Sequence, residues 1–181
     1  VSWLLERSQE DLSKLGVELR ELKPPFEKLT YDEAIEMLRK KGVEIEWGDD
    51  LGADEERVLS EQFDQPFFIV GFPRKIRSFY HKPDPEDERL TLSSDLMAPE
   101  GYGEITSGGE RIESYEGLLE SIRFHGLSPE DYSWYLEIRK HGMPQHSGFG
   151  LGVERTLRWL LRLDHIREAI LFPRTPTRTF P

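Results

Sequence analysis

The chain has 181 residues, 33% of them charged, with a net charge of −11 and no cysteine. The missing cysteines exclude a disulfide framework and a thiolate metal site, and the acidic balance argues against a protein that coats nucleic acid non-specifically. Because no apolar run approaches the roughly 20 residues that span a bilayer, we expect a cytoplasmic protein. The sequence also lacks asparagine, which together with its many charges is typical of thermophilic proteins.

Two helices are predicted in the first quarter of the chain. Apolar residues at helical spacing predict an amphipathic helix over residues 1–15. The two prolines at 24–25 then force an extended break. Thr30 and Glu33 have the spacing of a capping box, and they predict the start of a second helix that Gly42 ends.

The middle of the chain alternates between strand and helix patterns. Residues 43–47 alternate as a short strand does, and the continuous apolar run 66–72 predicts a buried strand. The acidic run 48–56 lacks the spacing of an EF-hand, which favours a loop leading into a helix over residues 54–63 and disfavours a metal site.

The remaining elements complete an α/β chain of the α+β type. Strands are predicted at 90–96, 103–107 and 148–152, and helices at 115–125, 128–141 and from 153 onward. Since the strands come in neighbouring pairs, without regular βαβ units, we expect an antiparallel sheet flanked by helices. The signatures of a Rossmann unit and of a Walker phosphate loop are both missing from the sequence.

Three glycines at alternate positions stand out, at 148, 150 and 152. They give a strand one face without side chains, so a flat ligand or another backbone can lie against it. Arg155 follows in the first turn of the next helix, where a cation is unfavourable unless an anion is present. The pattern predicts a site for a phosphate and a ring; the alternative is a closely packed strand–helix corner with a surface arginine.

Two acids lie in strands that are otherwise apolar or made of small residues. Asp95 and Glu104 are costly there unless they face a cation or solvent. Ser107 is close enough to Glu104, in an irregular strand, to add a hydroxyl. Carboxylates and hydroxyls are the hard oxygen ligands that Mg²⁺ takes. The alternative for Asp95 is a turn or edge residue.

Four blocks of the sequence, in their order along the chain, resemble the class II aminoacyl-tRNA synthetases of the aspartyl/asparaginyl branch. Residues 148–155 (Gly-Phe-Gly-Leu-Gly-Val-Glu-Arg) are similar to motif 3 of that family, and the other blocks are 98–105, 144–148 and 164–174. The resemblance covers residues 24–181 and implies an incomplete catalytic domain with motif 3 at 148–161. Motif 1, motif 2 and the anticodon-binding domain of the family are missing from the chain, and Val1 already stands within a helical pattern. We therefore expect residues 1–181 to be the carboxyl-terminal part of one catalytic domain in a larger protein.

The resemblance also implies a reaction and its residues. Members of the branch activate an amino acid with ATP and Mg²⁺, transfer it to tRNA and form homodimers, and they need no protein nucleophile. Arg155 and Glu104 correspond to catalytic positions. The implied metal ligands are Asp95, Glu104 and Ser107; the implied ATP contacts are Glu104, Ile105, Ser107, Gly152 and Arg155; the implied amino-acid contacts are Ser107, Gly108, Arg111, His146 and Gly148.

The choice of amino acid stays open between two substrates. Residues 106–111 are closer to the aspartyl form and to the archaeal asparagine synthetase related to these enzymes. Residues 98–104, residues 47–50 and Ser147 favour asparagine. We expect an asparaginyl enzyme, with three alternatives: an aspartyl enzyme, an ammonia-using asparagine synthetase, and a truncated paralogue that only binds.

Overall fold

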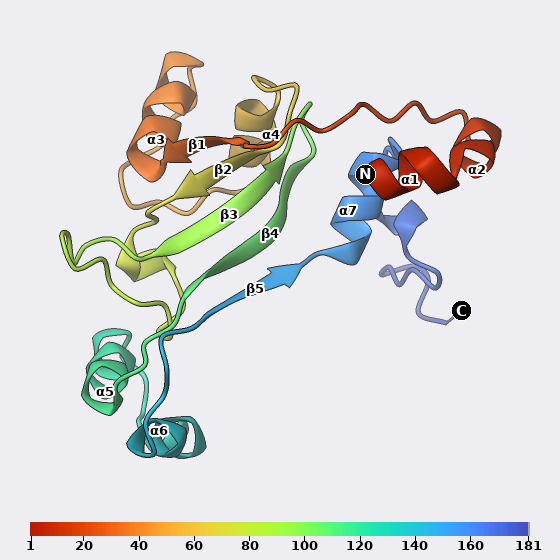
Figure 1. Cartoon of the computed structure of the whole chain (residues 1–181). Coiled ribbons are helices and arrows are strands. Elements are labelled where there is room, and N and C mark those ends of the chain that lie inside the picture. Colours follow the sequence, from red (N-terminus) through yellow and green to blue (C-terminus); the bar gives the residue numbers. More distant parts are fainter. Residues whose placement is uncertain (181) are drawn as a thin grey trace.

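A five-stranded sheet organises the computed structural model, which describes residues 1–180 (Figure 1). Its strands lie side by side in chain order: β1 (Glu27–Thr30), β2 (Phe67–Val70), β3 (Ser93–Ala98), β4 (Gly103–Glu110) and β5 (Ser147–Leu151). Three neighbouring pairs are antiparallel, which confirms the predicted sheet, and β1 pairs with β2 in parallel. The parallel pair is possible because a long crossover, with two helices, separates β1 from β2.

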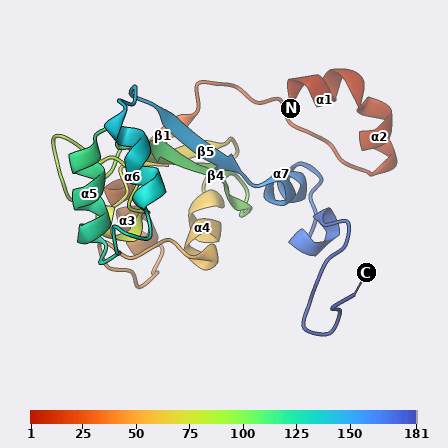
Figure 2. The same ribbon diagram turned by 90° about the horizontal axis from the view of Figure 1, so that it is seen from below.

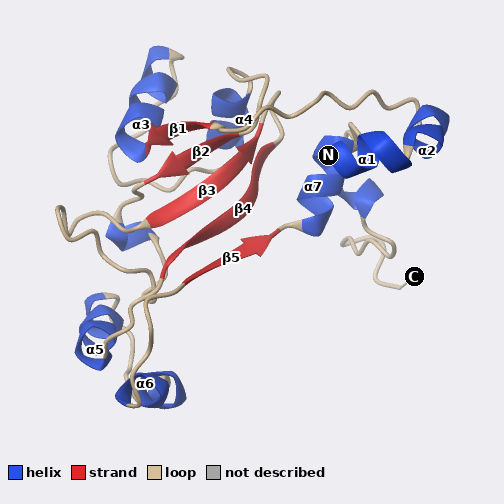
Figure 3. Ribbon diagram, viewed as in Figure 1, coloured by secondary structure: helices blue, strands red, loops and turns tan. Residues whose placement is uncertain are grey.

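Most helices flank the sheet on one face or at its ends, and the two at the amino terminus lie away from it (Figure 3). They are α1 (Ser2–Arg7), α2 (Gln9–Lys14), α3 (Tyr31–Lys40), α4 (Ala53–Ser60), α5 (Tyr115–Phe124), α6 (Ser133–Lys140) and α7 (Val153–Leu160), with short 3₁₀ turns η1 (Arg74–Ile76) and η2 (Ile166–Ala169). In Figure 2, α3 and α4 lie below the strands. In the part of the chain that the structure describes, no helix is long and apolar enough to cross a membrane.

The main core lies between the sheet and helices α3 and α4. Phe67 and Ile69 are fully buried and point to the side of α3 and α4, where Ile35 and Leu59 pack against them. The predicted capping box starts α3: the Thr30 hydroxyl accepts from the Glu33 amide at 3.2 Å, and the Glu33 carboxylate accepts from the Thr30 amide at 2.8 Å. This local signal fixes where the chain leaves β1 and enters α3.

A β-bulge in β4 decides which side chains reach the same face of the sheet. Asp95 pairs with Ser107, but the next pair on that face joins Met97 to Glu104, since Ile105 is an extra residue. Regular alternation would turn Glu104 and Ser107 to opposite faces, whereas the bulge turns both to the face of Asp95. The predicted irregularity of this strand is confirmed.

Two predicted elements near the amino terminus differ from the structure. Residues 1–15 form two helices, because the backbone leaves the helical region at Ser8 (φ −124°). Residues 43–47 belong to no strand. There the side chain of Trp47 is held by its indole N–H, which donates to Asp32 at 2.6 Å, and the segment has no neighbouring strand to pair with.

Two helices near the carboxyl end also differ in detail. The helix expected from residue 128 begins at Ser133, after a series of turns. Helical spacing puts Val153, Leu157, Leu160 and Leu161 on one apolar stripe along α7, but Val153 is 58% exposed and Leu157 is also exposed. Trp159 is the buried residue of this helix, and Leu160 packs against the same cluster. The other side of α7 faces solvent because no element of the described chain covers it.

Candidate active site

The glycine face of β5 is open. Gly148 and Gly150 pair with Gly109 and Ser107, so they lie on the same face of the sheet as Asp95. A Cβ atom on Gly150 would meet no heavy atom within 4 Å. The side-chain-free surface predicted from the glycine spacing is therefore present and accessible.

Arg155 lies over the end of this surface. Gly152, which precedes α7, is tied to β4 by its amide, which donates to the Ile105 carbonyl at 2.9 Å. One turn later Arg155 Nη1 donates to the Glu104 carbonyl at 2.8 Å and contacts Glu56 Oε2 at 3.4 Å. The side chain is 46% exposed, so its remaining N–H groups are available to a ligand.

Three carboxylates gather beneath Arg155. Glu56 comes from α4 and accepts the amide of Glu104 at 3.0 Å. Burial is the main cause that raises the pKa of Glu104, and the charges of Asp95 and Glu56 raise it further. Burial likewise raises the pKa of Glu56. Negative charge is therefore concentrated here, which favours a bound cation.

Asp95 has a partner that the sequence analysis missed. The Asp95 carboxylate is 4% exposed and forms an ion pair with Arg77. Arg77 also donates to the Ser107 hydroxyl at 3.3 Å and lies 3.6 Å from the centre of the Phe72 ring. The only local signal was a group of cations directly after the buried strand β2, which is too common to single out one arginine.

The amino-acid end of the predicted site is built around Arg111. Its Nη2 donates to the Gly148 carbonyl at 3.0 Å, and its Nη1 bonds to His81 Nε2 at 3.0 Å. Its amide donates to the His146 carbonyl at 2.9 Å. The ring of His146 is turned toward its own loop, where Nδ1 bonds to the Pro144 carbonyl at 2.9 Å. His81 was missed because sequence spacing does not relate it to Arg111.

Most of the predicted residues thus lie close to one another, while the His146 ring is turned toward its own loop. The charges of Asp95, Glu104 and Arg155 act on one another, Arg77 joins Asp95 to Ser107, and Arg111 borders the glycine face. Two of the predicted residues, Ile105 and Gly108, can contribute only backbone atoms to the site. The Ile105 side chain is buried, and Gly108 lies against β5 so closely that a Cβ atom would be 2.6 Å from the Gly148 carbonyl.

Comparison with known proteins decides the family. The model of the class II tRNA synthetases (D, K and N) matches residues 2–176. The chain belongs to this family. It is 54% identical over its whole length to the asparagine–tRNA ligase of Pyrococcus abyssi and 48% identical to that of Desulforamulus reducens, and it spans 43% of each.

Solved structures of this family confirm the fold class. The asparaginyl-tRNA synthetase of Pyrococcus horikoshii complexed with asparaginyl-adenylate has a TM-score of 0.89 and 53% identity, covering 98% of this chain and 42% of that one. The aspartyl-tRNA synthetase of Entamoeba histolytica has a TM-score of 0.81 and 37% identity, covering 90% of this chain and 35% of that one. The fold is therefore that of the catalytic domain of class II synthetases, an α/β architecture with the sheet at its centre.

The oxygen donors of this site are suited to Mg²⁺. Asp95 Oδ1 is buried without a hydrogen-bond partner in the described part of the chain, and Glu104 and Ser107 face the same side. No three acids or histidines among residues 1–180 are arranged to hold an ion unaided. An ion here would take its other ligands from phosphates and water, as Mg²⁺ commonly does.

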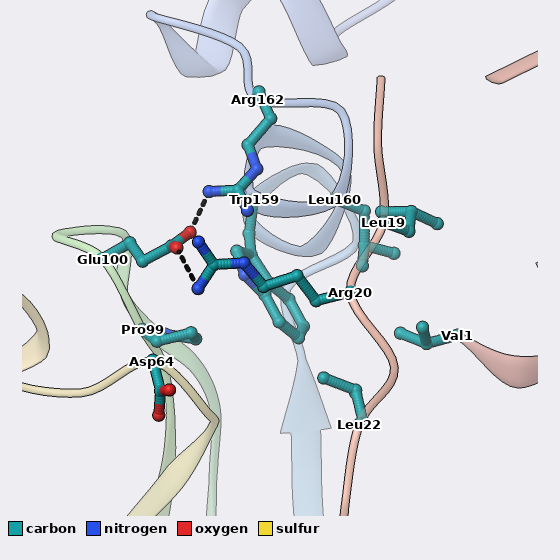
Figure 4. Close-up of a pocket in the computed structure, with 10 residues that line it drawn as sticks. All are labelled: Val1, Leu19, Arg20, Leu22, Asp64, Pro99, Glu100, Trp159, Leu160 and Arg162. Atoms are coloured by element: carbon teal, nitrogen blue, oxygen red, sulfur yellow. Dashed lines mark hydrogen bonds and ion pairs between the residues drawn. The ribbon is translucent and has the colours of Figure 1, made fainter. Parts of the chain in front are cut away.

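A partly exposed clamp of three charged side chains holds the far end of α7 (Figure 4). Glu100, in the β3–β4 turn, accepts from Arg20 at 3.0 Å and from Arg162 just beyond α7. Glu100 and Arg162 are the two non-glycine residues with positive φ in the described chain, at 61° and 55°. Such backbone persists where surrounding contacts over-determine it, so α7, and with it Arg155, is fixed relative to β4.

We expect the variant Glu104→Gln to be more stable than the parent chain at neutral pH. A carboxyl whose pKa is raised in the folded state holds a proton that the unfolded chain has released, so stability falls as pH rises above its ordinary value of 4.5. The uncharged side-chain amide of glutamine does not titrate, so the variant does not lose stability in this way. Thermal unfolding between about pH 4 and pH 8 should show a gain that grows with pH.

The capping residue Glu33 is the matched control. Its pKa is lowered by hydrogen bonds from the Thr30 backbone and hydroxyl, so its charged form stabilises the fold above pH 4.5. Glu33→Gln should therefore lower stability at neutral pH, with a difference that shrinks on acidification. If Glu104→Gln and Glu33→Gln changed the stability in the same direction, the raised pKa of Glu104 would be contradicted.

Proposed function

We propose that the protein to which this chain belongs is an asparagine–tRNA ligase, which activates asparagine with ATP and transfers it to tRNA. The identity of 54% to proteins of that name, over the whole chain, carries the proposal. The similarity to a synthetase complexed with asparaginyl-adenylate supports it, because the open glycine face provides room for such a ligand.

The geometry suggests how the residues divide the work. The asparagine carboxylate attacks the α-phosphate of ATP and pyrophosphate leaves, so catalysis depends on positioning and charge and not on a protein nucleophile. Arg155 holds the γ-phosphate with its planar fork. Gly148 and Gly150 let the nucleotide lie on β5, and Arg111 contacts the amide oxygen of asparagine. Asp95, Glu104 and Ser107 would hold Mg²⁺, which would supply positive charge to the phosphates.

The remaining residues of the prediction take supporting roles in this proposal. Ile105 and Gly152 contribute backbone groups beside the nucleotide, and Gly108 and His146 border the amino acid. The chain spans 43% of its relatives, so motif 1, motif 2 and an anticodon-binding domain are assigned to the rest of a cytoplasmic, homodimeric protein. Because this part has a net charge of −11, we assign most of the contact with tRNA to the rest of the protein as well.

An aspartate–tRNA ligase or an asparagine synthetase on the same fold is the second candidate. Residues 106–111 favour it, as does the structural similarity to an aspartyl-tRNA synthetase. A non-catalytic paralogue is disfavoured, because the charges of Asp95, Glu104, Arg111 and Arg155 are all present in one site.

ATP–pyrophosphate exchange by the full-length protein tests the proposal. We expect asparagine to support exchange and aspartate to fail, and the isolated chain of residues 1–181 to be inactive for lack of motif 2. Exchange with aspartate alone would move the assignment to the aspartyl enzyme. Formation of free asparagine from aspartate and ammonia, without tRNA, would identify the synthetase.

A further inference from the structure

The Arg111 guanidinium is surrounded by uncharged groups. In the described part of the chain its side-chain contacts are the Gly148 carbonyl at 3.0 Å, the imidazole of His81 at 3.0 Å and the ring of Tyr80, whose centre is 4.7 Å away. An arginine paired with a carboxylate has its charge neutralised by the protein. Arg111 instead keeps its full charge for a ligand.

The protonation state of His81 follows from its two hydrogen bonds. Nδ1 lies 3.2 Å from the Ser78 carbonyl and must donate to it, whereas Nε2 faces the N–H of Arg111 and must accept. A guanidinium only donates, so His81 is neutral, with its proton on Nδ1. Burial lowers the pKa of His81 to about 4, and the positive charges of Arg111 and Arg77 contribute to the shift.

The backbone holds the imidazole in this place from both sides. The Lys82 amide donates to the Glu110 carbonyl at 2.9 Å, and the Ile112 amide donates to the Tyr80 carbonyl at 3.2 Å. The ring fills the space beside Gly109, where a Cβ atom would be 2.8 Å from His81 Cδ2. His81 is therefore a rigid acceptor built into the wall of the site, with 6% of its surface exposed.

We propose that His81 is a positioning residue that orients the Arg111 guanidinium toward the side chain of the substrate amino acid. The inference rests on the proposed function, in which Arg111 contacts the asparagine side chain. A carboxylate at position 81 would pair with Arg111 and neutralise it, and a cation would repel it. A neutral acceptor is the one choice that fixes the guanidinium while leaving its charge to the substrate.

Two substitutions of similar volume separate the hydrogen bond from packing. His81→Gln keeps an acceptor for Arg111, and His81→Met removes it. In exchange assays with the full-length protein, we expect His81→Met to raise KM for asparagine by about tenfold or more, with KM for ATP within about twofold. His81→Gln should recover most of the affinity. Equal effects on both substrates, or no effect of His81→Met, would overturn the proposal.

A measurement without substrate keeps the test separate from the proposed function. In ¹⁵N spectra of full-length protein labelled at both histidine and arginine, His81 should be neutral, protonated on Nδ1, at pH 6.5 and titrate near pH 4. The Arg111 Nε–H signal should change in His81→Met and stay in His81→Gln. A doubly protonated ring at pH 6.5, or an Arg111 signal that neither variant changes, would overturn the positioning role. Failure of the parent protein to use asparagine, with these signals as expected, would refute only the proposed function.

Discussion

Replacing Arg155 by alanine is expected to lower kcat/KM for ATP by about 10²–10³, with KM for asparagine within about threefold. The guanidinium is anchored to the Glu104 carbonyl at 2.8 Å and to Glu56, and the side chain is exposed enough for its other N–H groups to meet a ligand. The γ-phosphate that we place there would lose a charged, two-pronged donor. Pyrophosphate exchange with each substrate varied in turn measures both constants.

The same substitution should leave the fold intact. A cation in the first turn of a helix opposes the helix dipole, which offsets the loss of the contacts of Arg155 with Glu56 and the Glu104 carbonyl, so Arg155→Ala should change the melting temperature only slightly. Arg158→Ala, one turn along α7, is the control: its guanidinium lies 5.4 Å from the Tyr102 ring and, among the described residues, bonds to neither Glu56 nor Glu104, as Arg155 does, so its removal should spare the ATP constants. A fall in melting temperature with parallel losses for both substrates would indicate a structural role for Arg155.

Replacing Arg77 by methionine is expected to lower the free energy of unfolding by about 3–5 kcal/mol. The substitution would leave the Asp95 carboxylate buried, with its second oxygen already without a hydrogen bond. Removing both charges together, in Arg77→Met with Asp95→Asn, should restore most of the stability, since the cost comes from the unpaired charge. Chemical denaturation of the two variants tests this directly.

An exposed ion pair provides the comparison. Arg89 bonds to Asp87 at 2.6 Å, but the arginine side chain is largely in solvent. Arg89→Met should cost less than about 1 kcal/mol, because water replaces the lost partner. Losses of similar size in Arg77→Met and Arg89→Met would show that burial does not set the strength of the Arg77–Asp95 pair.

The stability and the chemistry of the site oppose each other. Glu104 and Glu56 are held close to Asp95 at the expense of raised pKa values, and Arg155 stands against a helix dipole. Arg155 offsets only part of this negative charge, since the pKa values of Glu56 and Glu104 stay raised in its presence. Such conflicts are typical of functional sites, where local rules are broken and the loss is compensated elsewhere in the fold.

Local chemistry in the sequence determined a large part of this protein. The alternate glycines predicted the bare face of β5, and Thr30 and Glu33 predicted the start of α3. These signals succeed because each depends on neighbours within a few residues. The motif order extended the prediction to the family, which the comparisons confirm.

Tertiary structure alone decided the partners of the site. Arg77, His81 and Glu56 lie 18, 30 and 48 residues from the groups that they bond, Asp95, Arg111 and Glu104. Sequence spacing carries no information about such pairs, because they meet only when separate strands and helices pack together. The parallel pairing of β1 and the solvent exposure of α7 were settled the same way, by which neighbours the rest of the fold brings to each surface.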